Sequence, residues 1–244
     1  MDGIRCIPVI VAGGKGRRMG EQVKKQYLML DGLPVLVRTL KVFDRHAGLD
    51  PAILVVPEKD RSWCQKNLIQ PHGFVRPIHL VSGGGTRQES VRNGIRKAES
   101  LAGDPVRTLV LIHDGVRPFV PQDLIDSLME TAVRKGGCIP VLAVADTLKQ
   151  VGLDSRIQKT LNRDQVFRAQ TPQVFRLDLI LKAFEHAQDS GFTGTDDSSL
   201  MEHAGFAVYA IPGSAGNIKL TTPQDLEHAR HILELNGRPE AQSK

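Results

Sequence analysis

A short apolar run, Ile7-Pro8-Val9-Ile10-Val11, leads directly into the glycine-rich basic segment Ala12-Gly13-Gly14-Lys15-Gly16-Arg17-Arg18-Met19-Gly20. The apolar run predicts a buried β-strand, and the four glycines after it let the backbone turn tightly and approach a ligand closely. Backbone N–H groups in such a turn form a concave site for anions. Three cationic side chains inside the segment, and Lys25 soon after it, supply positive charge for a polyphosphate. The segment therefore predicts a binding site for a nucleoside triphosphate.

Two better-known phosphate-binding motifs do not fit this segment. The P-loop pattern GxxxxGK[ST] is absent, and the dinucleotide pattern GxGxxG would need a glycine at position 19, where Met19 stands. A glycine-rich turn after a strand is by itself weak evidence, because it also serves as a simple connection. The basic residues at its end favour a ligand site.

The length of 244 residues and the hydrophobic content of 41% fit one large α/β domain or two small ones, and we expect a single domain over residues 1–244. The net charge of +5 is mild, and the basic residues lie beside glycine loops, which favours a small anionic substrate over nucleic acid. Cys6, Cys64 and Cys138 form no metal-binding pattern, so we expect free thiols in a reducing cytoplasm. No apolar run reaches the roughly 18 residues of a membrane span, and we expect no signal peptide.

Strand-like and helix-like segments alternate along the chain. β-Branched runs predict strands at residues 53–56, 78–81, 108–112, 138–145 and 206–211. Apolar residues at helical spacing predict helices around residues 33–43, 91–98, 124–132 and 177–184. Thr222-Pro223-Gln224-Asp225 is typical of a capped helix start. This alternation predicts a mostly parallel sheet flanked by helices, with ligands bound beyond the carboxyl ends of the strands.

Polar clusters follow several of the predicted strands. They occupy residues 82–90, 113–118, 146–147 and 217–219. Each cluster alone has an ordinary explanation as a turn or a solvated surface. Their repeated position after strands indicates that one crevice gathers them.

The segment from Asp146 to Gln173 breaks the alternation. It is strand-like on both sides of a turn near residues 152–154, with few apolar residues and many charges. An isolated hairpin is marginally stable in water. We therefore expect it to pack against another subunit.

Eight motifs stand in order between residues 9 and 226: AGGxGxRM, KQY, GGxxRxxSV, HDxxRP, DT, AQTPQ, TDD and NIKxTTPxDL. Together they resemble the 2-C-methyl-D-erythritol 4-phosphate cytidylyltransferase family. The resemblance implies a Rossmann-like nucleotidyltransferase fold and a homodimer with a protruding β-hairpin arm at about residues 147–171. It also implies transfer of a cytidylyl group from CTP to 2-C-methyl-D-erythritol 4-phosphate, on the methylerythritol phosphate route to isoprenoids.

The resemblance assigns roles residue by residue. The CTP phosphates are expected at Ala12, Gly13, Gly14 and Gly16, and the cytosine at Gly84, Gly85 and Ser90. The ribose and magnesium are expected near Asp114 and Gly115, and the methylerythritol phosphate near Arg117, Thr147, Thr171 and Lys219. Charge at the reacting α-phosphate is assigned to Arg18, Lys25 and Lys219, and Arg163 is expected to reach the neighbouring subunit's site.

The implied reaction needs cations more than a general base. A phosphate dianion is already a nucleophile, and positioning and charge stabilisation dominate phosphoryl transfer. Magnesium is expected, bound mainly through the CTP phosphates with few protein ligands.

Four positions depart from the family's usual residues, and three other functions stay open. The departures are Gly13, Lys24, Gly85 and Val116, of which Gly85 removes a carboxylate. A ribitol-5-phosphate cytidylyltransferase is the nearest alternative. A dinucleotide-dependent oxidoreductase lacks support because the third glycine is missing, and retention of Arg18, Lys25 and Lys219 argues against a non-catalytic nucleotide-binding regulator.

Overall fold

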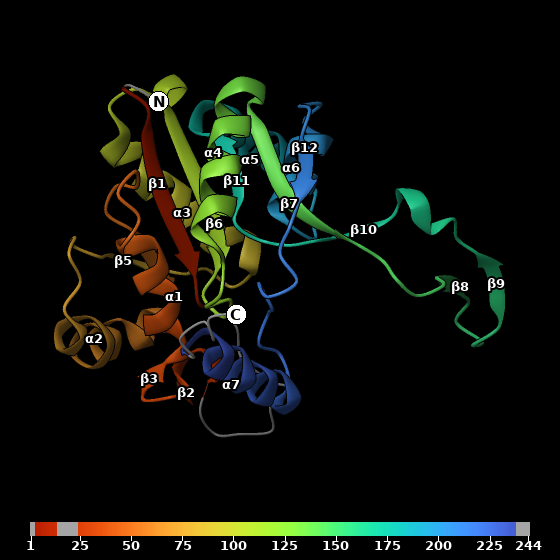
Figure 1. Cartoon of the computed structure of the whole chain (residues 1–244). Coiled ribbons are helices and arrows are strands. Elements are labelled where there is room, and N and C mark those ends of the chain that lie inside the picture. The colour runs from red at the N-terminus through yellow and green to blue at the C-terminus, as the bar shows by residue number, and fades with distance from the viewer. Residues whose placement is uncertain (1–2, 14–23, 238–244) are drawn as a thin grey trace, which may run out of the picture.

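The computed structural model describes residues 3–13 and 24–237. Within these residues one eight-stranded sheet forms the centre of the molecule (Figure 1). Its strands, in spatial order, are β10 (Phe167–Ala169), β7 (Gly137–Ala143), β11 (Gln173–Arg176), β6 (Thr108–Asp114), β1 (Arg5–Val11), β4 (Ile53–Val56) and β5 (His79–Ser82), and β12 (Tyr209–Pro212) pairs with β7. Strands β6, β1, β4 and β5 are parallel, and β11 is antiparallel to both β6 and β7.

Helices cover both faces of the sheet because the central strands are apolar on both sides. In β6, Leu109 and Leu111 pack under α1 (Val35–Asp44) and α4 (Gln122–Lys135). Val110 and Ile112 of the same strand pack under α3 (Arg87–Ala102), α5 (Leu177–Asp189) and α6 (Asp197–His203). This is the pattern of a buried parallel strand, whose alternate side chains enter two separate cores.

A third apolar cluster joins the chain's last helix to the sheet's carboxyl edge. Helix α7 (Pro223–Gly237) contributes Ala229, which shares the cluster with Val116, Leu220, Leu30 and Val35. The helix begins with the predicted capping box, since the Thr222 N–H donates to Asp225 Oδ2 at 2.8 Å and the Asp225 N–H donates to Thr222 Oγ1 at 3.3 Å. The cluster places residues 217–220 beside the loop that follows β6.

Helix α3 lies close to the sheet at Gly94. A Cβ atom there would lie 2.5 Å from Val9 Cγ1 and 2.9 Å from Val55 Cγ2, so only glycine allows this approach. The close approach fixes the N-terminal end of α3, and the glycine turn before it, beside the ends of β1 and β4.

The remaining elements are short. They are α2 (Arg61–Cys64), the strand pair β2 (Met29–Leu30) and β3 (Leu33–Pro34), and the helical turns Lys25–Tyr27, Glu58–Asp60, Gln65–Ile69, Gln70–His72, Pro105–Arg107 and Arg163–Gln165. The predicted parallel sheet with flanking helices is confirmed. The predicted strand at residues 206–211 begins later, at Tyr209, and β11, α2 and α6 were not predicted.

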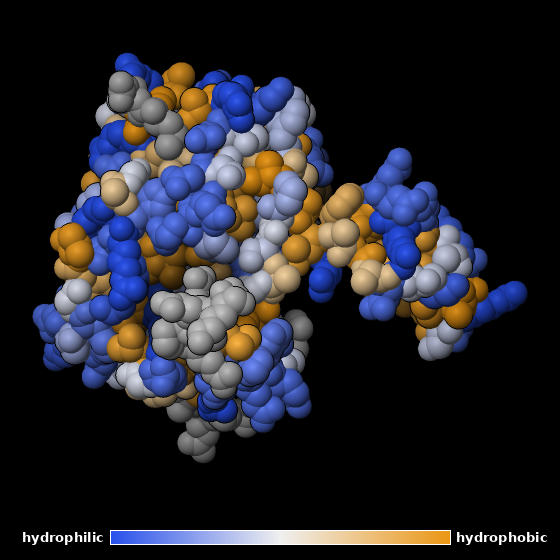
Figure 2. Space-filling view, in the orientation of Figure 1, coloured by the Kyte–Doolittle hydropathy of each residue, from blue (hydrophilic) through white to orange (hydrophobic). Residues whose placement is uncertain are grey.

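The predicted hairpin is present as an arm that extends away from the body (Figure 1). Its strands are β8 (Lys149–Val151) and β9 (Ile157–Thr160), which pair only with each other among the described strands. Figure 2 shows apolar residues on the arm and where it joins the body. They include Val151, Leu153, Ile157 and Phe167, all more than half exposed. An arm with so little burial within its own chain depends on other contacts for its order.

Candidate active site

The site lies at the carboxyl edge of the sheet, where β1 ends between β4 and β6. The Ala12 N–H donates to the Val55 carbonyl at 2.8 Å, and the Gly115 N–H donates to the Val11 carbonyl at 2.9 Å. The start of the glycine-rich segment is therefore held between β4 and the loop that follows β6. Gly14, Gly16 and Arg18, predicted at the phosphates, lie outside the described residues, whereas Ala12, Gly13 and Lys25 lie within them.

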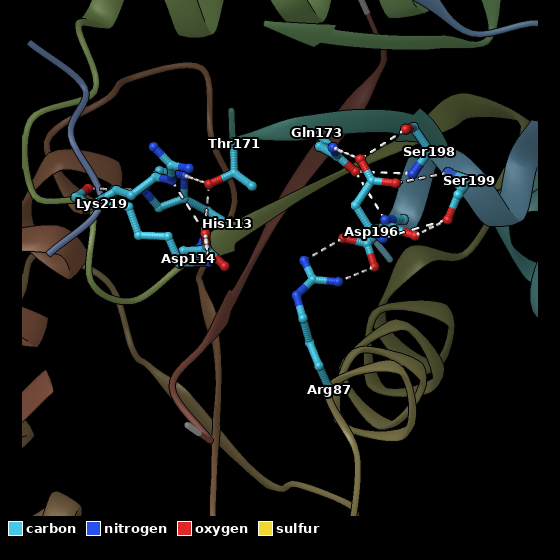
Figure 3. A network of polar contacts seen from close by, with 11 residues as sticks. Arg87, His113, Asp114, Thr171, Gln173, Asp196, Ser198, Ser199 and Lys219 are labelled. Carbon is cyan, nitrogen blue, oxygen red and sulfur yellow. Dashed lines mark hydrogen bonds and ion pairs between the residues drawn. The ribbon is translucent and has the colours of Figure 1, made fainter. Parts of the chain in front are cut away.

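Asp114, the last residue of β6, is the anionic centre of this edge (Figure 3). Its Oδ2 lies 2.9 Å from Lys219 Nζ and 3.2 Å from Arg117 Nε. Burial alone would raise the pKa of Asp114, but Lys219, Arg87 and Arg117 outweigh burial and hold the pKa well below its usual range. Asp114 is therefore ionised at neutral pH, and the structure brings it together with Lys219 as predicted.

Arg117 is nearly buried and faces inward. Besides Asp114, its guanidinium reaches the Asn217 carbonyl through Nη1 at 2.8 Å. Only 9% of the residue is exposed, so Arg117 ties the loop after β6 to the segment that carries Lys219. Its expected contact with the methylerythritol phosphate stays a prediction.

His113 and Thr171 form a buried pair beneath Asp114. His113 Nδ1 lies 3.0 Å from Thr171 Oγ1, which also accepts the Asp114 N–H at 3.1 Å. His113 Nε2 lies 2.9 Å from the Arg117 carbonyl, a pattern that assigns the proton to Nε2 and makes Nδ1 the acceptor. Burial lowers the pKa of His113 to about 4, so the ring is neutral at pH 7. Thr171 thus orients Asp114, and its expected substrate contact remains a prediction.

The predicted cytosine loop has a preset shape. Ser90 Oγ accepts the Gly84 N–H at 3.1 Å and donates to the Thr86 carbonyl at 2.8 Å. The Gly85 N–H donates to Glu89 Oε2 at 2.6 Å, so a carboxylate stands beside Gly85 although the residue itself has none. A Cβ on Gly84 would lie 2.4 Å from Glu89 Cβ, which explains the glycine.

The cytosine loop also lies next to the start of the phosphate loop. A Cβ on Gly13 would lie 3.6 Å from Ser90 Oγ. Gly13 and Ser90, predicted to bind different parts of one nucleotide, are therefore neighbours.

A second buried network, not predicted from sequence, joins α3 to α6 (Figure 3). Arg87 binds Asp197 through two hydrogen bonds of 2.9 and 2.7 Å. Gln173 Oε1 accepts the N–H groups of Asp197 and Ser198, and Gln173 Nε2 donates to Asp196 Oδ2 at 2.7 Å. The motif TDD therefore caps α6 and holds Arg87. The sequence feature that could have indicated this network is the pair of acidic residues, Asp196 and Asp197, at the start of α6.

Two predicted site residues lie on the arm segment, away from this cluster. Thr147 and Arg163 are both exposed, and they lie in the segment between the end of β7 and the start of β10, which carries the arm. Arg163 donates to the Ala145 carbonyl. Within residues 3–13 and 24–237, no hydrogen bond or ion pair of either side chain reaches Asp114 or Lys219, so their roles stay predictions.

The donor set fits a magnesium ion held mostly by its substrate. In residues 3–13 and 24–237 no three His, Cys, Asp or Glu side chains are grouped to hold a metal. Mg²⁺ in nucleotide sites commonly takes one or two carboxylates and completes its shell with phosphates and water. Among the described residues, the ionised Asp114 carboxylate at this edge is a candidate for such a ligand. In the described part of the chain, no helix has the length and apolar character to span a membrane.

Comparison with known proteins finds relatives that match most of this chain. A family model described as 2-C-methyl-D-erythritol 4-phosphate cytidylyltransferase matches residues 6–235. A relative of that name from Syntrophotalea carbinolica is 44% identical, covering 94% of this chain and 96% of its own. Another, from Geobacter metallireducens, is 41% identical and covers 93% and 96%.

Comparison with solved structures leads to the same family. The 4-diphosphocytidyl-2C-methyl-D-erythritol synthase of Anaerococcus prevotii superposes with a TM-score of 0.80 at 33% identity, covering 96% of this chain and 97% of its own. The Thermus thermophilus 2-C-methyl-D-erythritol 4-phosphate cytidylyltransferase gives 0.74 at 29% identity, covering 95% and 98%. These matches support the methylerythritol interpretation and not the ribitol-phosphate alternative. The chain belongs to the 2-C-methyl-D-erythritol 4-phosphate cytidylyltransferase family of nucleotidyltransferases.

Proposed function

We propose that this chain transfers the cytidylyl group of CTP to 2-C-methyl-D-erythritol 4-phosphate, forming 4-diphosphocytidyl-2-C-methyl-D-erythritol and pyrophosphate. The observation that carries the proposal is the 2.9 Å ion pair between Asp114 and Lys219. It joins two motifs far apart in the chain at the carboxyl end of β6, the strand that lies beside the one leading into the glycine-rich segment. The family membership then supplies the substrates and the place in isoprenoid precursor synthesis.

The cations of this edge address the main obstacle, which is repulsion between two anionic reactants. An oxygen of the methylerythritol phosphate forms a bond to the α-phosphorus of CTP, and the bond from that phosphorus to the bridging oxygen of pyrophosphate breaks. Lys25 and Lys219, with Arg18, are the side chains proposed to stabilise negative charge at the α-phosphate. The Lys219 side chain is 40% exposed and can reach a ligand at this edge, whereas the nearly buried Arg117 contacts Asp114 from the protein interior.

The nucleotide is proposed to lie across the two glycine loops. The backbone at Ala12 and Gly13 leads to the phosphates, and Gly84, Gly85 and Ser90 face the cytosine. A Cβ at Gly84 would clash with Glu89 of the same loop, which supports a tight turn here. The proposal holds that this turn accepts a pyrimidine and excludes a purine. Magnesium, when bound, neutralises phosphate charge, and Asp114 is the side chain that would hold it beside Gly115 and the ribose.

A homodimer is proposed because the arm lacks support within its own chain. The exposed apolar residues of residues 147–171 would pack against the second subunit, and Arg163 would complete its site together with Thr147. We place the enzyme in the cytoplasm, since its three cysteines are free thiols of the kind that reducing compartments maintain.

Pyrophosphate release tests the proposal directly. Purified protein with magnesium is given CTP or ATP, each with 2-C-methyl-D-erythritol 4-phosphate or ribitol 5-phosphate, and each reaction is repeated with a chelator. We expect turnover with CTP and the methylerythritol substrate only, and none with the chelator. Faster turnover of ribitol 5-phosphate would overturn the assigned substrate, and equal turnover of ATP would overturn the assigned base.

A further inference from the structure

The residues on either side of Lys25 are fixed by contacts with two different strand ends. Gln26 Nε2 donates to the Ala12 carbonyl at 2.8 Å, and the Gln26 side chain is buried. Lys24 forms an ion pair with Asp60, and the Tyr27 hydroxyl donates to Asp60 at 2.8 Å. The short helical turn Lys25–Tyr27 is therefore anchored on one side to β1 and on the other to the segment after β4.

Lys24 and Tyr27 converge on the same atom, Asp60 Oδ2. They can do so because the Tyr27 N–H donates to the Lys24 carbonyl at 2.8 Å, which closes one tight helical turn. In such a turn residues three apart share one face, so Lys25 occupies another face, about a third of a turn away. Asp60 thus holds the backbone on both sides of Lys25 through contacts on a face that differs from the one Lys25 occupies.

Asp60 is itself well placed to act as an anchor. It ends the turn Glu58–Asp60, just after β4, and its N–H donates to the Pro57 carbonyl at 2.8 Å. Its side chain is 14% exposed and that of Lys24 is 24% exposed. The carboxylate therefore comes from a rigid strand end and is largely shielded from solvent, unlike an ordinary surface ion pair.

We propose that Asp60 is a positioning residue for the cytidylyl transfer, acting through Lys24 and Tyr27 to fix Lys25 at the reacting α-phosphate. The proposal rests on the role of Lys25 given under the proposed function. Lys25 begins a turn of only three residues, Lys25–Tyr27, so its position depends on the contacts that its neighbours make. A misplacement of about 1 Å can lower turnover by up to a hundredfold. Loss of Asp60 is therefore expected to lower turnover beyond any loss of stability that removing a shielded ion pair causes.

A double-mutant cycle tests whether Asp60 acts through Lys25. Asp60→Asn removes the charge at nearly constant volume and is expected to lower kcat by about tenfold, with KM for CTP changed by less than about threefold. In a Lys25→Met background, the same substitution is expected to cause no further loss, because the group it positions is gone. Asp178→Asn is the matched control, since Asp178 is 16% exposed and pairs with Arg176 at the opposite edge of the sheet.

A proline at position 24 gives a rescue that a merely structural ion pair would not show. The Lys24 backbone has φ of −65° and ψ of 133°, which matches the φ that proline imposes. Lys24→Met removes the ion pair and is expected to lower kcat severalfold. Lys24→Pro also removes it but restrains the same backbone, so it is expected to recover a clear part of the turnover that Lys24→Met loses.

The outcomes separate this inference from the role of Lys25. If Lys25→Met keeps full turnover, the assigned role of Lys25 is wrong and the inference falls with it. If Lys25→Met loses turnover while Asp60→Asn matches Asp178→Asn, the inference alone is overturned. Independent, additive losses in the cycle also overturn it. Should Asp60→Asn not fold, Tyr27→Phe in both backgrounds makes the same test, with a loss confined to the Lys25 background as the supporting result.

Discussion

Replacing Lys219 by methionine separates catalysis from stability at the Asp114 centre. The Lys219 side chain is 40% exposed and its Nζ lies 2.9 Å from Asp114 Oδ2. Because solvent screens so exposed an amine, losing the pair should cost no more than about 1 kcal/mol of folding free energy. Arg117 still holds Asp114 at 3.2 Å, so the carboxylate stays ionised and in place. The folded state should therefore survive.

The loss of transition-state stabilisation should be larger. Removing one well-placed donor of charge at a phosphoryl centre costs about 3 kcal/mol of barrier, or roughly a hundredfold in kcat. A group that acts mainly in the transition state lowers kcat more than it weakens binding, so CTP affinity should fall much less than turnover. The predicted signature is a stable, CTP-binding, nearly inactive protein.

Initial rates of pyrophosphate release at saturating substrates give kcat, and calorimetric titration gives CTP affinity. Thermal unfolding checks the fold, and Lys182→Met, on the exposed side of α5, is the control for loss of a surface lysine. If kcat is unchanged and CTP binding disappears, Lys219 captures nucleotide without acting on the transition state. If neither changes, Lys219 is a surface charge and the reasoning is refuted.

Two further predictions concern the arm and the buried histidine. Mixing Lys25→Ala with Arg163→Ala protein should restore about a quarter of wild-type activity, because mixed dimers carry one intact site if Arg163 acts across the interface; no recovery in proven mixed dimers would contradict this. The pKa of His113 is lowered to about 4 in the fold, so unfolded chains take up its proton first as the pH falls. Between pH 6.5 and 4, the free energy of unfolding measured with urea should therefore fall by about 3 kcal/mol more in the wild-type protein than in His113→Asn. A native His113 resonance titrating near pH 6.5 would disprove it.

The parallel strands were predictable from sequence and the antiparallel strand between them was not. The run Ile53–Val56 is β-branched and buried throughout, and its predicted bounds are those observed. Strand β11 (Gln173–Arg176) has polar residues at both ends, and its partners β6 and β7 lie far away in sequence. Gln173 is buried because it meets the start of α6, a contact that no local pattern reveals.

The site was predictable where its residues follow strands. Asp114 is the last residue of β6. The carboxyl ends of parallel strands meet at one edge of the sheet, so residues that follow these strands come close together there, which is why Asp114 and Lys219 were expected at one site. The pairs Arg87 with Asp197 and Lys24 with Asp60 were not predicted. In sequence these residues look like ordinary surface charges, since only the tertiary fold decides which of them meet.

The charge balance around Asp114 explains how such a site can exist before any substrate binds. Lys219 and Arg117 contact this one carboxylate, so the contacting cations exceed its charge by one, while Arg87 acts on it from beyond contact distance and is paired with Asp197. Without an anion between them, two cations at one strand end would repel each other and turn outward into solvent. Asp114 keeps these cations oriented, and the free-energy cost of gathering the charges is met when the chain folds. The cations in turn stabilise the ionised carboxylate, which lowers the pKa of Asp114. Two anionic reactants then meet positive charge that needs little reorganisation, which is the condition under which electrostatic stabilisation lowers a phosphoryl-transfer barrier most.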